Sequence, residues 1–237
     1  MHRTITFSKR VGYFAVLGIL AIAAFSESKK TRRNTRKSHL KYDGQSILGG
    51  MVKAYTAPRY WTNKDYFFLG GALIVLLLIF LFDESLSKWF IKQEKNALPF
   101  LKDFGWYYGS PENHYAINGG FYIYGLLAKK EAVRKTGVLL ISSSMASGLI
   151  QTIAKTLIGR ARPLRNEGKL SFKPFSGENS YYSFPSGHSI LSFTTAYAIG
   201  TQFTNPVYRF ICYAFGSIAP LSRLWAGAHW VSDAATS

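Results

Sequence analysis

The segment from Tyr66 to Phe82 contains no charged residue, and its centre is a continuous apolar run from Leu73 to Phe80. As an α-helix this segment would be about 25 Å long. The hydrocarbon core of a bilayer is about 30 Å thick, so such a helix crosses it with slight thinning of the bilayer. The segment therefore predicts a membrane-spanning helix, and it restricts the fold to those that a membrane accommodates.

Four further apolar segments are expected to be helical, and together they predict an all-α, multi-spanning membrane helix bundle. They are 115–128, 137–158, 187–203 and 207–223. The segment 137–158 is rich in serine, alanine and glycine, which allow membrane helices to pack closely. Between residues 83 and 113, aromatic residues mix with charges, which is typical of an interfacial amphipathic helix and loop. Prolines and glycines between 159 and 184 predict a polar loop.

The first 65 residues differ in character from the rest of the chain. An apolar run at 11–25 follows a basic start and has the length of either a cleaved signal peptide or a membrane anchor. The basic residues between Lys29 and Lys41 favour a cytoplasmic, solvated segment. We therefore divide the chain into an N-terminal signal or anchor segment with a basic linker (1–65) and a membrane-embedded domain (66–237).

The formal net charge of +17 would suit a nucleic-acid-binding protein. However, the positive charge is dispersed between long apolar runs, which fits contact with anionic lipid headgroups better. We expect membrane lipids as partners and no nucleic acid, while the oligomeric state stays open. The single cysteine, Cys212, excludes a disulfide within the chain and a thiolate metal site. The sequence offers no evident carboxylate cluster for magnesium.

The basic cluster at 129–135 predicts a cytoplasmic loop. The helix from residue 137 then runs outward, the next helix enters from outside at about 187, and the last one leaves at about 223. Three polar segments, near 155–163, 185–188 and 222–233, thereby meet at the outer face of the membrane. This convergence predicts the position of a functional site.

Two of these segments contain groups that suit an anion. Lys155 and Arg162 are two helical turns apart, so we expect both on one side of a helix that Pro163 ends. The alternative is that they are snorkelling anchors at the membrane boundary. Pro185-Ser186-Gly187-His188 predicts a helix start whose unpaired N–H groups favour a phosphate. An ordinary serine-capped helix has the same pattern.

The third segment contains a histidine and a carboxylate. His229 and Asp233 follow Ser222-Arg223 and are four residues apart, which predicts that they face each other on one side of a helix. A carboxylate bonded to one ring nitrogen would orient the other nitrogen as a nucleophile or base. The alternative is a surface His/Asp pair.

Together these segments resemble the three-part signature of the type 2 phosphatidic acid phosphatase superfamily in its membrane form. The signature consists of Lys-x6-Arg-Pro at 155–163, Pro-Ser-Gly-His at 185–188 and Ser-Arg-x5-His-x3-Asp at 222–233. The resemblance implies that His229 attacks phosphorus, that Asp233 stabilises the resulting charge, and that His188 protonates the leaving alkoxide and then activates water. The residues that it assigns to the phosphate oxygens are Lys155, Arg162, Ser186, Gly187 and Arg223. It implies no metal and no other cofactor.

The resemblance implies metal-independent hydrolysis of a lipid or polyprenyl phosphate or diphosphate through a phosphohistidine. We expect the site to face the periplasm from a bacterial inner membrane. The substrate stays open between phosphatidic acid, phosphatidylglycerol phosphate and undecaprenyl diphosphate. The basic side chains of the 159–184 loop are expected to meet the headgroup, or to be merely solvated. The alternative functions are a non-catalytic lipid-binding protein and a vanadium-dependent haloperoxidase, the latter disfavoured by the apolar spans.

The sequence ends at Ser237, four residues after Asp233. Membrane proteins of the resembled family place a further helix around and after this aspartate. We therefore expect the final helix to be missing, the turn holding His229 and Asp233 to fray, and activity to be weak.

Overall fold

The computed structural model describes residues 36–237, and within this range it is all-α apart from one isolated bridge between Arg160 and Phe172. The predicted all-α class is confirmed. The run at 11–25 lies outside the described residues. The α-helices are α2 (Arg36–Thr56), α3 (Asn63–Leu81), α4 (Asp83–Gln93), α5 (Pro99–Tyr108), α6 (Pro111–Leu127), α7 (Glu131–Ile158), α8 (Gly187–Gly200), α9 (Pro206–Trp225) and α10 (Val231–Ala235).

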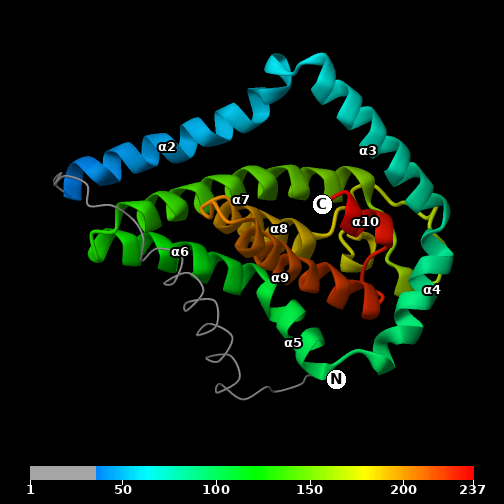
Figure 1. Ribbon diagram of the computed structural model, residues 1–237. Coiled ribbons are helices and arrows are strands. Elements are labelled where there is room, and N and C mark those ends of the chain that lie inside the picture. Colours follow the sequence, from blue (N-terminus) through cyan, green and yellow to red (C-terminus); the bar gives the residue numbers. More distant parts are fainter. Residues whose placement is uncertain (1–35) are drawn as a thin grey trace.

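The predicted spanning helix is α3, which begins where the backbone N–H of Thr62 donates to Asp65 Oδ2 at 2.7 Å. Helix α3 contains no buried residue, and most of its large apolar side chains are exposed. In Figure 1 it runs along the outside of the helix bundle. Apolar surface exposed to water costs about 25 cal/mol per Å² relative to buried surface, so a helix with this many exposed apolar side chains is unfavourable in water. The surroundings that suit α3 are therefore the hydrocarbon of a membrane.

Within residues 36–237, α7 is the second helix that is long and apolar enough to cross a membrane. It begins at Glu131, six residues before the predicted start at 137. Gly125 and Gly137 let α6 and α7 approach closely. A Cβ on Gly125 would lie 2.3 Å from the backbone nitrogen of Arg134, and one on Gly137 would lie 2.6 Å from the backbone nitrogen of Tyr122. Helix α7 also packs against α2 and α8, so it forms the centre of the bundle.

Alanine at position 137 is expected to destabilise the protein. The added methyl group has no room against the backbone of Tyr122, and overpacking of this kind costs about 1–3 kcal/mol. The matched control is Gly120→Ala, because a Cβ at Gly120 meets nothing within 4 Å. That variant should gain about 0.5–1 kcal/mol from the higher helix propensity of alanine. Thermal unfolding in detergent should give opposite shifts of Tm for the two variants, and equal shifts would contradict the close packing of α6 on α7.

Residues 36–56, assigned from the sequence to a basic linker, form helix α2 on the side of α7. The buried Asp43 forms an ion pair with Arg134 and accepts a hydrogen bond from Tyr122 Oη at 2.9 Å. Ser142 Oγ donates to the carbonyl of Ile47 at 3.0 Å. Polar groups of α2 therefore bond to residues of α6 and α7. The basic residues of this segment indicated only a solvated linker and did not predict these contacts.

The remaining helices surround the polar end of α7. Helix α9 packs against α8, α5 and α4, and α10 packs against α3 and α4. Two glycines bring α5 close, since a Cβ at Gly105 would lie 2.7 Å from Ser222 Cβ and one at Gly109 would lie 2.9 Å from His188 Cβ. The predicted amphipathic region 83–113 is thus resolved into the short helices α4 and α5 and the start of α6, and α5 lines the functional site.

Candidate active site

The three predicted segments meet at one end of the bundle, where the loop 159–184 (the polar loop) joins α7 to α8. Helix α7 ends at Ile158 because Gly159 adopts a left-handed conformation (φ 57°) and donates its N–H to the carbonyl of Lys155 at 3.0 Å. A side chain at Gly159 would also collide with the carbonyl oxygen of Lys173. The expectation that Pro163 ends the helix is therefore wrong, and Arg162 lies in the polar loop.

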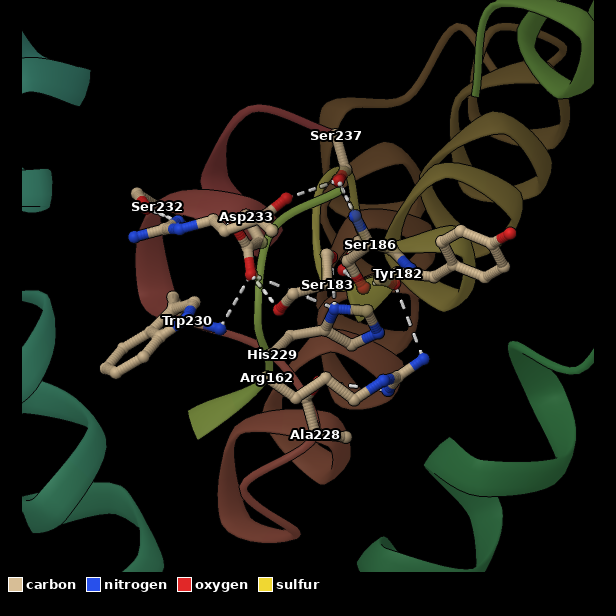
Figure 2. Close-up of polar contacts among 12 residues, drawn as sticks. Arg162, Tyr182, Ser183, Ser186, Ala228, His229, Trp230, Ser232, Asp233 and Ser237 are labelled. Atoms are coloured by element: carbon tan, nitrogen blue, oxygen red, sulfur yellow. Dashed lines mark hydrogen bonds and ion pairs between the residues drawn. The ribbon is translucent and has the colours of Figure 1, made fainter. Parts of the chain in front are cut away.

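Lys155 and Arg162 nevertheless lie side by side. Lys155 Nζ donates to the carbonyl of Tyr182 at 3.1 Å, and Arg162 Nη2 donates to the same oxygen at 3.4 Å. Arg162 Nη1 also donates to the carbonyl of Ala228 at 3.0 Å, which joins the polar loop to the segment before α10. Figure 2 shows the guanidinium of Arg162 extended between Ala228 and Tyr182, beside the ring of His229. Main-chain carbonyls thus hold two cations close to the histidine.

Helix α8 begins as predicted, with Ser186 as its N-cap. Ser186 Oγ accepts a hydrogen bond from Ser189 Oγ at 2.8 Å, so its own hydrogen remains available for donation. Gly187 lies in the first turn, and a Cβ there would lie 2.8 Å from Gln151 Nε2. Pro185 precedes the cap instead of occupying the first turn. This helix end presents a hydroxyl and free N–H groups to an anion.

His188 projects from the first turn of α8 toward α5. Its ring hydrogen-bonds to the backbone of Trp106, and the centroids of the two rings are 6.0 Å apart. The atom Nε2 is buried without a hydrogen-bond partner among the described residues. A buried nitrogen that lacks a partner is costly, so it is suited to bind a ligand.

Arg223, near the end of α9, carries two more buried donors without a partner in residues 36–237, Nε and Nη1. Its guanidinium carbon lies 4.0 Å from the ring centroid of Trp106, which orients the guanidinium by a cation–π contact. Trp106 lies on α5, far from the three motifs in sequence. It therefore contacts both His188 and Arg223, and no sequence motif singled it out.

His229 lies between α9 and α10 and is 2% exposed. Its Nδ1 is 2.6 Å from the carbonyl oxygen of Ser183, and a carbonyl only accepts, so Nδ1 carries the hydrogen and Nε2 the lone pair. Burial, together with Arg162, Lys155 and Arg223, holds the pKa of His229 well below its ordinary value. The imidazole is therefore neutral at neutral pH, and its lone pair is available.

The predicted bond between His229 and Asp233 is not formed. His229 precedes α10 instead of lying on a helix with Asp233, and Nδ1 is 4.0 Å from Asp233 Oδ2. That oxygen accepts instead from Ser183 Oγ at 2.5 Å and from the N–H of Trp230 at 2.9 Å (Figure 2). Asp233 thus fixes both the residue that binds His229 and the start of α10, and its effect on the imidazole is electrostatic.

No sequence motif indicated the residue that neutralises Asp233. Arg160 is 2% exposed, and its Nη1 donates to Asp233 Oδ1 at 2.5 Å. Its Nη2 donates to Asp83 Oδ2 at 2.8 Å. Burial raises the pKa of the Asp233 carboxyl, while Arg160, Ser183 and Trp230 oppose that rise. Asp83 is 77 residues away from Arg160, so no local pattern could have revealed the pair.

The other cations of the polar loop are engaged within the protein. Arg165 pairs with Glu178 at 2.9 Å, and Lys173 pairs with the same carboxylate at 3.0 Å. Lys169 Nζ caps the end of α3 at the carbonyls of Phe80 and Leu81. These three side chains therefore have partners within the protein, and their contact with a headgroup stays a prediction.

Comparisons with known proteins show what the chain is similar to. Residues 136–237 match the family model described as the PAP2 superfamily, and this part of the chain is similar to that superfamily. Two bacterial relatives named lipid A 1-phosphatase, from Rhizobium etli and Rhizobium johnstonii, are each 39% identical over 101 residues, or 41% of this chain. The alignments span 42% and 40% of these relatives, so the chain matches about two fifths of their length. No solved structure matches.

Proposed function

We propose that this protein is a membrane-embedded phosphatase that releases phosphate from a lipid phosphate through a phosphohistidine on His229. The observation that carries the proposal is the hydrogen bond from Nδ1 of His229 to the carbonyl of Ser183. It leaves the lone pair on Nε2, beside the cations that would hold a phosphate. A neutral imidazole among buried cations is arranged to attack an anionic phosphorus centre.

The first step forms the bond between Nε2 and phosphorus and breaks the bond between phosphorus and the lipid oxygen. His188 enters this step as the imidazolium, because the bound phosphate offsets the neighbouring cations, and the leaving alkoxide takes a proton from its Nε2, which has no protein partner within residues 36–237. In the second step a water molecule transfers a proton to His188 and attacks phosphorus, and the bond to His229 breaks. Inorganic phosphate then leaves.

Charge stabilisation comes from residues on three elements. Arg223 contributes Nε and Nη1, the two buried donors without a partner in the described part of the chain. Lys155 and Arg162 give up the shared carbonyl of Tyr182, or keep it while contacting an equatorial oxygen. Ser186 Oγ and the N–H of Gly187 complete the set at the start of α8. Asp233, at 4.0 Å from Nδ1, stabilises the positive charge that His229 acquires. This scheme uses no metal ion.

A phosphorylated glycolipid is the first substrate to test, because the two relatives are named for lipid A. Trp106 supports this choice physically. It is 48% exposed while it contacts His188 and Arg223, so it offers an aromatic face next to the site of the leaving group. Aromatic faces pack well against apolar surfaces such as sugar rings and acyl chains. Polyprenyl and glycerolipid phosphates remain the competing substrates.

We further propose that the site faces the outside of a bacterial inner membrane. The basic turn at 129–130 and Lys155 lie at opposite ends of α7, and a helix of this length is about 42 Å long. A cytoplasmic turn therefore requires an external site. Labelling a cysteine at the exposed Lys173, in a Cys212→Ser background, with an impermeant maleimide on intact inner-membrane vesicles of known orientation tests this assignment.

The decisive experiment measures phosphate release by purified protein in mixed micelles containing a chelator. The panel contains lipid A, phosphatidic acid, phosphatidylglycerol phosphate and undecaprenyl diphosphate. Mass spectrometry of the lipid A product identifies which phosphate is lost. Release from at least one lipid in the presence of the chelator supports the proposal. Binding of these lipids without any release would instead identify a non-catalytic lipid-binding protein.

A further inference from the structure

Three charged side chains form a buried ionic chain beneath the histidine, consisting of Asp83, Arg160 and Asp233. The side chain of Arg160 is 3% exposed and both carboxylates are fully buried. Arg160 bonds to Asp83 at 2.8 Å and to Asp233 at 2.5 Å. Its guanidinium also lies over the rings of Phe80 and Trp230, at 4.9 and 5.3 Å. This buried ionic chain therefore connects the start of α4 with the start of α10.

Asp83 also fixes the position of α10. Its Oδ1 accepts the N–H of Ser232 at 2.9 Å, and its Oδ2 accepts the hydroxyl of Ser232 in addition to the Arg160 bond. Ser232 precedes Asp233 in the first turn of α10. The position of Asp233, and through Ser183 that of His229, is thus linked to a residue of α4 that lies outside residues 136–237.

The charge balance of the ionic chain gives Asp83 a role beyond packing. One arginine would suffice to neutralise Asp233, and burying a second carboxylate is costly. Because Asp83 offsets Arg160, the three residues together carry one negative charge, and that charge lies 4.0 Å from His229 at Asp233. Without Asp83, Arg160 would cancel Asp233, and the positive form of His229 would lose its counter-charge.

We propose that Asp83 is a positioning residue of the histidine site, acting through Arg160 to preserve the negative charge of Asp233 opposite His229. This inference rests on the proposed function. Around His229, α7 contributes Lys155, the polar loop Arg162, α9 Arg223 and α10 Asp233. Asp233 is therefore the one negative group among these neighbours. Loss of the negative charge at Asp233 should change the protonation equilibrium of His229 and leave the phosphate-binding cations unchanged.

Replacing Asp83 with asparagine should lower the pKa of His229. The pKa of His229 already lies below its ordinary value because of burial and three cations. Asp83→Asn removes one negative charge, so the imidazolium is disfavoured further and the pKa falls. The acidic limb of the rate profile, which marks protonation of His229, should then move to lower pH. The double variant Asp83→Asn/Arg160→Gln removes one charge of each sign, so it should return the limb toward the wild-type position.

The experiment compares Asp83→Asn, the double variant and Asp43→Asn. The last is a matched control, because Asp43 is a second buried aspartate paired with an arginine, on α2 and α7. Rates are measured against pH, and the titration of the His229 imidazole is followed by NMR with ¹⁵N-labelled histidine. We expect kcat of Asp83→Asn to fall about tenfold or more at unchanged KM, with the imidazole titrating at lower pH.

Three outcomes decide the proposal. A displaced His229 titration in Asp83→Asn that the double variant reverses, and that Asp43→Asn does not share, supports it. An unchanged titration and unchanged kcat, together with a loss of Tm like that of Asp43→Asn, overturns it and leaves Asp83 a structural residue. If Asp83→Asn does not fold, the double variant decides the proposal. A His229 titration equal to that of the wild type supports the role of Asp83 in the charge balance, and a displaced titration overturns it. The NMR titration needs no turnover, so a wild-type protein without phosphatase activity refutes the proposed function separately.

Discussion

Replacing His229 with glutamine should reduce phosphate release at least about 10³-fold, because residues that form the covalent intermediate carry effects of this size or larger. The amide of glutamine can still donate to the carbonyl of Ser183, so the local fold keeps its hydrogen bond. It has no nucleophilic lone pair to attack phosphorus. The variant should therefore bind lipid phosphate with nearly unchanged affinity while turnover is lost.

The measurement pairs steady-state rates with trapping of the intermediate. Lipid labelled with ³²P should leave acid-labile, base-stable label on the wild-type protein and none on His229→Gln. Circular dichroism and Tm close to those of the wild type exclude unfolding as the cause. Retention of more than a tenth of wild-type activity would refute a nucleophilic role for His229.

Replacing Arg223 with alanine should lower kcat about 10²–10³-fold, the cost of losing a preorganised donor to a developing charge. Nε and Nη1 of this side chain are buried and have no hydrogen-bond partner within residues 36–237, so in the proposed mechanism they are available to a phosphate oxygen. Arg223→Lys should recover only part of the loss, since an ammonium keeps the charge but lacks the planar pair of donors.

The matched control for Arg223→Ala is Arg209→Ala, at the other end of the same helix. Arg209 is exposed and donates to the carbonyl of Phe203 at 2.7 Å. The Arg209→Ala variant should change kcat and KM by less than twofold. If both arginines lowered the rate equally, the effect would come from α9 as a whole, and the role of Arg223 in holding phosphate would be wrong.

The sequence predicted those features that local chemistry determines. Uninterrupted apolar side chains predicted α3, and the serine before Gly187 predicted the start of α8. The meeting of the three polar segments followed from the alternating direction of the helices. The apolar segment 137–158 also predicted the end of α7 at Ile158, but the residue that ends the helix is the left-handed Gly159 and not Pro163.

Long-range contacts could not be predicted from the sequence. Counting residues on an ideal helix suggested a direct bond from Asp233 to His229, whereas a carbonyl of the polar loop takes that place. The ion pair between Arg160 and Asp83 joins residues 77 positions apart. The place of Trp106 in the site could not be predicted either, because its contacts with His188 and Arg223 depend on the close approach of α5. Periodicity locates helices, but tertiary packing selects the partners of their polar groups.

Main-chain carbonyls orient much of the site, and this has an evolutionary consequence. Arg162 is held by the carbonyls of Asn179, Tyr182 and Ala228, and His229 by that of Ser183. A carbonyl is present whatever side chain the residue carries. Positions such as 179 and 228 can therefore drift in sequence while the acceptor stays in place, as long as the backbone path is kept. Selection at these positions acts on the shape of the loop, and a comparison of side-chain identities alone would underestimate how much of the polar loop takes part in the site.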